Sequence, residues 1–277
     1  MSMRINHNIL SMTAQRNLWS TQNDLDRAVT RLSSGLRINN AWDDPAGLAI
    51  SERFRAQISS MEEAERNANN NINLMQTAEG ALSVIDEKLV RMRALAIEAS
   101  NGSLLSTDRE ALDVEYQQLV SEINRIAQVT NYNGLALLDG SFSSQGLKFH
   151  IGTYNVQNED YYYVSFNSMT TSALGLSGTS LLTTANAQTA IGSIDAAISS
   201  KDTERTRLGA FVERLQGTIM QLQVAEENAT SAESEIRDAD IAEEMSEFVR
   251  AQILMQSGVS VLAQAKMLPQ IVASLVG

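Results

Sequence analysis

The sequence has 277 residues, of which 43% are hydrophobic and only 5% aromatic, and it contains no cysteine. This length and apolar content support a folded protein, while the missing cysteine excludes disulfides, thiolate catalysis and cysteine-ligated metals. The formal net charge of −12 argues against a nucleic-acid partner, because phosphate binding requires clustered Lys and Arg.

Long uninterrupted helices are favoured by the composition. Pro45 and Pro269 are the only prolines, and straight-chain residues are plentiful. The first ten residues lack the apolar core of a secretory signal, and no window reaches the roughly 18 apolar residues of a membrane span. We therefore expect no membrane insertion, and a protein that leaves the cytoplasm would need another export route.

The first predicted helix covers about residues 5–34 and ends near Gly35, because glycine readily adopts the left-handed conformation that terminates a helix. A joint loop follows, and its last residues form a strong helix-start signal, with a carboxylate cap before a proline. The apolar stripe of this helix is Leu18, Leu25, Ala28 and Leu32, and the joint contains Trp42, Asp43, Asp44 and Pro45.

From Pro45 to about residue 100 the apolar pattern is nearly continuous. A helix of this size would be on the order of 80 Å long, which indicates a rod rather than a compact domain. Another helix is predicted from Asp108 to near Asn133-Gly134.

A glycine- and tyrosine-rich segment at about residues 135–180 is the predicted β region. Within it, GLKFHIG and YYYVSF each predict a short strand. A further long helix is predicted over residues 184–235, and Arg237-Asp238-Ala239-Asp240 marks a second joint.

The last helix carries apolar residues in alternating steps of four and three, a repeat that faces a partner helix. This stripe contains Ile241, Met245, Phe248, Met255, Val259 and Leu262. The predicted fold is mainly α: an elongated antiparallel helical bundle or coiled-coil rod with a small β-hairpin region. Residues 1–44 and 236–277 would supply the terminal helices, and residues 45–235 the rod domain.

An enzyme is not supported by the residues present. His7 and His150 lie in different segments, and neither belongs to a zinc-binding HExxH pattern. Asp43 and Asp44 could be imagined as paired catalytic carboxylates, but a capping role beside Pro45 explains them better. No glycine-rich phosphate loop occurs, so we expect no catalytic residue, cofactor or metal.

Several longer motifs resemble one family. LSSGLRIN at 32–39, DDPAGLAIS at 43–51, NGLALLDG at 133–140, RAQIL at 250–254 and SVLAQA at 260–265 are similar to bacterial flagellin, in the same order. The resemblance covers about 140 residues at the front and about 90 at the back. Trp42 departs from the family pattern, which usually has a smaller or polar residue there.

The resemblance implies a structural subunit that is exported unfolded and polymerises into the flagellar filament for motility. The terminal helices would form the inner-core coiled coil, and no outer variable domains are expected. The implied partners are other copies of the chain, an export chaperone, the filament cap and the hook-junction proteins. The implied location is an extracellular flagellum, or a periplasmic one in a spirochaete.

The resemblance also implies recognition by Toll-like receptor 5 through Arg91, Leu95 and Glu115, residues that would also serve packing between subunits. Two alternative functions stay open at this point. A hook–filament junction protein would share the terminal helices, and a soluble coiled-coil adaptor would form a finite oligomer rather than a filament.

Overall fold

The computed structural model describes the backbone of residues 7–276 and the side chains of residues 7–267. Residues 1–6 and Gly277 lie outside the described residues. They include residues 5 and 6 of the predicted first helix and the ends of the two predicted terminal segments. The chain divides into two compact units. Unit 1 combines residues 1–58 with residues 227–277, and unit 2 consists of residues 59–226.

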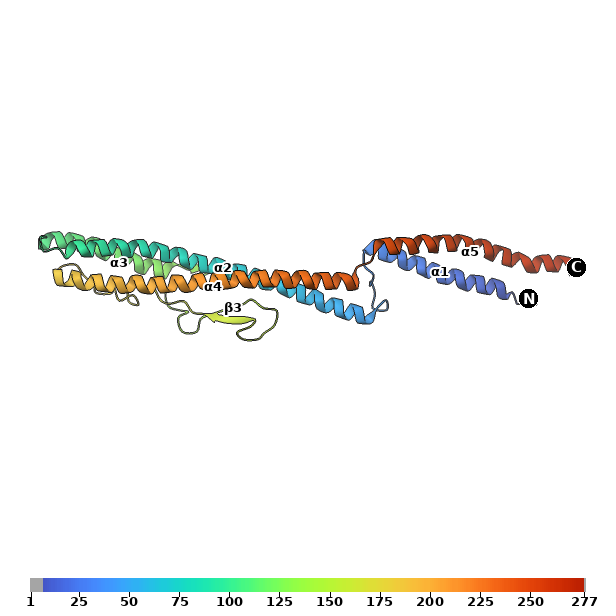
Figure 1. Cartoon of the computed structure of the whole chain (residues 1–277), viewed down its shortest axis with the longest axis horizontal. Helices are drawn as coiled ribbons and strands as arrows, with labels where there is room; N and C mark the ends of the chain where they lie inside the picture. Colours follow the sequence, from blue (N-terminus) through green and yellow to red (C-terminus); the bar gives the residue numbers. More distant parts are fainter. Residues whose placement is uncertain (1–6, 277) are drawn as a thin grey trace. The chain divides into compact units, whose positions relative to one another are not determined.

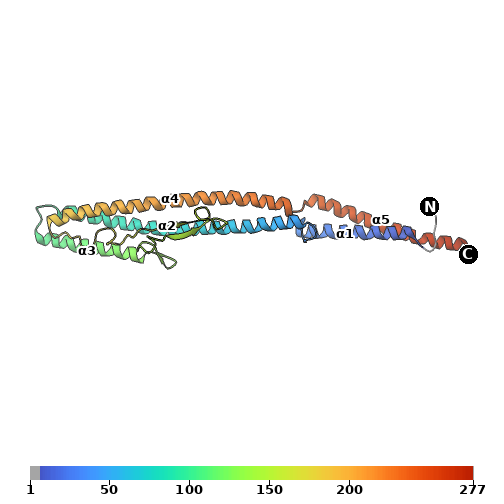
Figure 2. The ribbon, with the colours of Figure 1, turned by 90° about the horizontal axis from the view of Figure 1, so that it is seen from below.

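Unit 1 is built around two helices from opposite ends of the sequence, α1 (Ile9–Ser34) and α5 (Ile241–Val276). They lie side by side in both ribbon views (Figures 1 and 2). Their direction is antiparallel, because Asn8 donates to the carbonyl of Ala265 at 2.7 Å while Arg31 contacts Glu244 at 2.8 Å. The first turns of α2 (Pro45–Ala99) and the last turns of α4 (Thr184–Arg237) complete this unit.

The helix ends in unit 1 follow the sequence signals. Gly35 terminates α1 with a φ of 72°, and its N–H donates to the carbonyl of Arg31. Asp44 caps α2, because its Oδ1 accepts the N–H of Gly47 at 2.9 Å and Pro45 is the first helical residue. The capping role expected of this acidic pair therefore belongs to Asp44.

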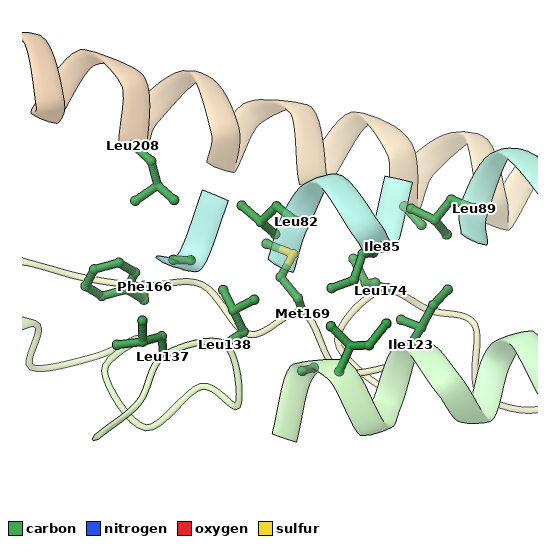
Figure 3. Packing of buried hydrophobic residues seen from close by; sticks show 14 of the residues in the cluster. Leu82, Ile85, Leu89, Ile123, Leu137, Leu138, Phe166, Met169, Leu174 and Leu208 are labelled. Carbon is green, nitrogen blue, oxygen red and sulfur yellow. The ribbon is translucent and has the colours of Figure 1, made fainter. Parts of the chain in front are cut away.

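Unit 2 packs α2, α3 (Ser106–Val129) and α4 around one apolar core (Figure 3). Between α2 and α4 the contacts Arg93–Asp195, Lys201–Asp86 and Arg205–Glu79 show an antiparallel pair, since the partner number falls as the α2 number rises. Figure 3 shows side chains of α2, α3, α4 and the loop segments after α3 meeting in this core. The labelled side chains include Leu82, Ile85, Leu89, Ile123, Leu138, Met169 and Leu208.

The β region begins earlier than predicted. α3 ends at Val129, and Asn133-Gly134 forms the turn between β1 (Asn131–Tyr132) and β2 (Leu135–Ala136). Both turn residues have positive φ, 50° and 82°, the geometry of a tight hairpin rather than a helix end. The prediction that the helix continues to Asn133-Gly134 is therefore wrong, because α3 ends at Val129 and these two residues belong to a short hairpin.

The two longer predicted strands are confirmed as β3 (Leu147–His150) and β4 (Tyr161–Val164), an antiparallel pair with Phe149 opposite Tyr162. One face of this pair buries Phe149, Tyr162 and Val164 in the unit 2 core. The other face carries a stacked pair, His150 on Tyr161, with Lys148 over the Tyr161 ring. The predicted fold class, mainly α with antiparallel helices and a small β region, is confirmed.

Candidate assembly surface

The contact between α1 and α5 is a seam of covered side chains in a seven-residue repeat. On each helix the positions that are buried or half-buried recur in alternating steps of three and four. On α1 they are Ser11, Ala14, Leu18, Thr21, Leu25, Ala28 and Leu32, with Thr13 and Arg31 also half-buried beside them, and on α5 they are Glu244, Phe248, Ala251, Met255, Gly258, Leu262 and Ala265.

Large and small residues alternate along this seam. On α5 the large side chains Phe248, Met255 and Leu262 take one position of the repeat, and small residues such as Ala251 and Gly258 take the other. A β-carbon added to Gly258 would lie 2.7 Å from Leu18 Cδ2. Leu18 thus fills the space that glycine leaves, and the two backbones approach closely at this level.

A charged pair closes one end of the seam. Arg31 on α1 donates to Glu244 on α5 at 2.8 Å, and Glu244 is 9% exposed. A carboxylate this buried needs a paired cation, since burying a lone charge is costly. The pair therefore favours one register of α1 against α5.

The predicted terminal-helix residues divide into two groups in this structure. Leu18, Leu25 and Leu32 lie on the seam, and so do Phe248, Met255 and Leu262. Ile241, Met245 and Val259 are instead 51%, 45% and 56% exposed, so α1 does not cover them. The sequence analysis included Ala28 but missed the small seam positions of α5, although the seven-residue spacing of Ala251, Gly258 and Ala265 was the available signal.

Much apolar surface in unit 1 is left uncovered. Rows of exposed large side chains run along both helices beside the seam, and such surface on a water-soluble chain typically marks an interaction site. On α1 these are Ile9, Leu10, Met12, Trp19 and Val29, and on α5 they are Ile241, Met245, Val249, Ile253, Leu254, Val259, Val261 and Met267.

The residues predicted to meet a receptor are not all on the surface. Arg91 on α2 and Glu115 on α3 form an exposed two-bond ion pair, at 2.7 and 3.0 Å. The hydrogen bond from Arg91 lowers the pKa of Glu115. Leu95 is only 1% exposed and belongs to the unit 2 core, so its placement on that surface is wrong. It lies one turn from Arg91 on the side of α2 that α3 and α4 cover.

The joint loop presents one large apolar side chain. Trp42 is 80% exposed, whereas the neighbouring Asp43 accepts hydrogen bonds from the N–H groups of Asn39 and Asn40. Asp44 and Pro45 begin α2. The predicted joint residues therefore have different roles: Asp43 and Asp44 are half-buried and bind backbone N–H groups, whereas Trp42 and Pro45 are exposed.

Buried charges in unit 2 are paired between structural elements. Lys201 on α4 is 2% exposed and contacts Asp86 on α2 at 2.5 Å. Burial alone would lower the pKa of Lys201, but hydrogen bonds to Asp202 and Asp86 outweigh it and raise that pKa. Glu204, fully buried, accepts hydrogen bonds from Arg207 and Asn167. These pairs hold the helices and the loop together.

In the described part of the chain, no three acidic or histidine side chains gather closely enough to hold a metal ion. Over the same residues, none of the helices combines the length and apolar character needed to cross a membrane. Apolar helix faces are thus the chemically distinctive surface of unit 1.

Comparison with known proteins decides the family. Residues 5–143 match the bacterial flagellin N-terminal helical region, and residues 191–276 match the bacterial flagellin C-terminal helical region. The chain belongs to the bacterial flagellin family. It is therefore a structural subunit that polymerises with its own kind into the bacterial flagellar filament for motility. Flagella of its relatives are extracellular or periplasmic.

Individual relatives agree with this family. A flagellin of Halalkalibacterium halodurans is 43% identical over 273 residues, which cover 99% of each chain. A flagellar filament 33 kDa core protein of Treponema phagedenis is 40% identical over 287 residues, again with 99% of each chain covered. Both therefore match this flagellin along nearly its whole length.

One solved structure bears on the fold only. A protein of Vibrio parahaemolyticus described as flagellar hook-associated shares a TM-score of 0.58 at 15% identity, covering 71% of this chain and all of that one. Identity this low shows a shared fold and not a shared role. No finding favours the hook–filament junction alternative for this flagellin.

Proposed function

We propose that polymerisation uses the uncovered apolar faces of α1 and α5, so that residues 1–44 and 236–277 form the inner-core coiled coil and residues 45–235 the rod domain. The observation that carries this proposal is the second row on α5. Met245 and Val259 lie two seven-residue repeats apart and are both exposed, whereas α1 covers the adjacent row of Phe248, Met255 and Leu262.

The energetics favour many simultaneous contacts. Burying one such side chain contributes about 1.5–3 kcal/mol, while fixing a subunit in place costs an estimated 4–15 kcal/mol. A single pair of side chains therefore cannot hold a subunit, but the thirteen exposed apolar residues of the two helices can. This imbalance favours assembly onto an existing filament end, where several neighbours are met at once.

Seeded elongation tests the proposal. Purified chain is added to short fragments of filaments made from the same protein, and filament length is followed by electron microscopy. We expect elongation by the unaltered chain and none by Met245→Asp/Val259→Asp, which places charges on the uncovered row. Asp substitutions at Thr206 and Thr218, exposed or half-exposed positions of α4 in unit 2, are the matched control. Normal elongation by the Met245/Val259 variant would contradict the proposal.

The further partners follow from the same surface. Apolar helices that are uncovered in the free chain need protection before assembly, which suits an export chaperone. At the two filament ends they would contact the cap and the hook-junction proteins. We place the assembled chain in a secreted, extracellular flagellum, or in a periplasmic flagellum if the source is a spirochaete. We also propose that it has no catalytic activity.

Recognition by Toll-like receptor 5 is proposed for the Arg91–Glu115 pair alone. The pair is exposed and crosses two helices of unit 2, so a receptor could read it in the released subunit. Leu95 would act only by supporting α2 from inside the core. This role is tested by measuring receptor activation by the Arg91→Asp variant, which should fall, with Arg93→Asp as the control for the change of charge. Unchanged activation by the Arg91→Asp variant would contradict the role.

A further inference from the structure

The joint loop between α1 and α2, whose path Figure 1 shows, carries an exposed tryptophan, Trp42. Trp42 is 80% exposed, and none of the ring contacts or hydrogen bonds between described side chains involves it. We infer that Trp42 is an anchor between subunits, which inserts into the surface of a neighbouring copy of this chain in the filament. The inference rests on the proposed role of unit 1 in polymerisation.

The turn that carries Trp42 is fixed by its own hydrogen bonds. The N–H of Asp43 donates to the carbonyl of Asn40 at 3.0 Å, closing a turn with Trp42 inside it. The Asp43 carboxylate accepts from the N–H groups of Asn39 and Asn40 at 3.2 and 2.9 Å. These bonds fix the backbone at Trp42, so the position from which its side chain starts is set before association.

The turn is also tied to the rest of unit 1. The N–H of Arg37 donates to the carbonyl of Arg237 at 2.7 Å, and the N–H of Ala239 donates to the carbonyl of Gly35 at 3.0 Å. Ile38, in the same loop, is 2% exposed. Because the backbone is ordered before association, little further ordering is needed when Trp42 is buried by a partner.

A second copy is the occupant that these observations favour. The chain polymerises with itself, so its surfaces meet other copies of the same surfaces. The backbone bridge between Leu36 and Asp238 puts the start of the loop next to the start of α5, where Ile241 and Met245 are exposed. Unit 1 thus exposes Trp42 in addition to the apolar faces of its helices, and tryptophan is one of the residue types enriched among residues that dominate interface energies.

Fluorescence quenching measures the burial of Trp42 directly. In a Trp19→Phe chain Trp42 is the single tryptophan, and acrylamide quenching is compared between the free chain and filaments grown from seeds of the same variant. We expect quenching to fall severalfold in the filament. Filaments in which Trp42 is quenched as readily as in the free chain would overturn the inference. If Trp19→Phe does not polymerise, the difference between the unaltered chain and Trp42→Phe gives the same quantity.

The lowest concentration that sustains filament growth provides a second test of the Trp42 anchor. Trp42→Ala should raise the lowest concentration that sustains filament growth on the order of tenfold or more, and Trp42→Phe should raise it less. The thermal midpoint of the free Trp42→Ala chain should be unchanged, because the side chain is exposed there. A growth concentration equal to that of the unaltered chain would contradict the anchor role alone. Failure of the unaltered chain to elongate seeds would instead contradict the proposed function.

Discussion

Leu18 on α1 lies over Gly258 on α5, so closely that a β-carbon at position 258 would come within 2.7 Å of Leu18 Cδ2. This contact sets the approach of the two terminal helices and, with it, the apolar row that stays uncovered. The close approach of the two helices depends on a small residue at one position of α5. Adding a single methyl group at that position therefore tests it.

Gly258→Ala should weaken the pairing of α1 with α5 by on the order of 1 kcal/mol, because overpacking against Leu18 costs more than the helix gains when alanine replaces glycine. The measurement is amide hydrogen exchange in α1 and α5 of the free chain, which should become faster. Adding Leu18→Ala to the variant should restore part of the protection.

Gly192→Ala is the matched control, since no atom lies within 4 Å of an added β-carbon at that position in α4. It should raise the free energy of unfolding of unit 2 by about 0.5–1 kcal/mol and leave exchange in α1 and α5 unchanged. Exchange in α1 and α5 that is the same for Gly258→Ala and Gly192→Ala would mean that the helices do not meet closely at Gly258.

The contact of Lys201 with Asp86 predicts an asymmetry between its two partners. Asp86→Ala leaves a buried ammonium group with Asp202 as its remaining partner, and should lower the free energy of unfolding by about 1–3 kcal/mol. Lys201→Met replaces the buried charge with an apolar chain of similar length, and should stay within about 1 kcal/mol of the unaltered chain. Urea unfolding measures the free energy of unfolding of both variants. A larger decrease for Lys201→Met than for Asp86→Ala would contradict this account of α2–α4 packing.

The Arg91–Glu115 pair predicts a component of acid sensitivity. Its hydrogen bond holds the pKa of Glu115 below the ordinary value. The pair therefore contributes stability above the unfolded-state pKa of about 4.3, and this contribution is lost as the pH falls through the lower folded-state pKa. The loss of unfolding free energy between about pH 5 and about pH 3 should be smaller in Glu115→Gln than in the unaltered chain.

Removing the other partner should act in the same direction. Arg91→Gln takes away the hydrogen bond that lowers the pKa of Glu115, so this variant should also lose less stability on acidification. A pH dependence in both variants equal to that of the unaltered chain would show that the pair does not form in solution. Exposure of both side chains keeps the expected effect small.

Local signals determined the helix ends well. Asp44 before Pro45 begins α2, and Gly35 ends α1 with the predicted left-handed conformation. Asn133-Gly134 was misread because the same dipeptide can end a helix or turn a hairpin. The choice between them depends on Leu137 and Leu138, whose burial in the unit 2 core requires the chain to reverse at that point.

The local sequence pattern could not show which face of a helix is covered, because that depends on the helices packed against it. The seven-residue repeat on α5 predicted a partner helix, but Val259 and Gly258 lie on two neighbouring faces that both fit such a repeat. Only the packing of Leu18 shows that α1 covers the face with Gly258. Leu95 lies near Arg91 on α2, so spacing alone could not separate them. The presence of α3 and α4 puts one in the core and leaves the other exposed.

Hydrogen exchange of the terminal helices before and after assembly tests the central claim most directly. Amides of α1 and α5 are compared between the free chain and seeded filaments, with the unit 2 part of α2 as an internal reference. If the uncovered faces of the terminal helices are the assembly surface, their amides exchange faster than the reference in the free chain and become as strongly protected as the reference in the filament. Full protection of α1 and α5 already in the free chain, with no change on assembly, would contradict it.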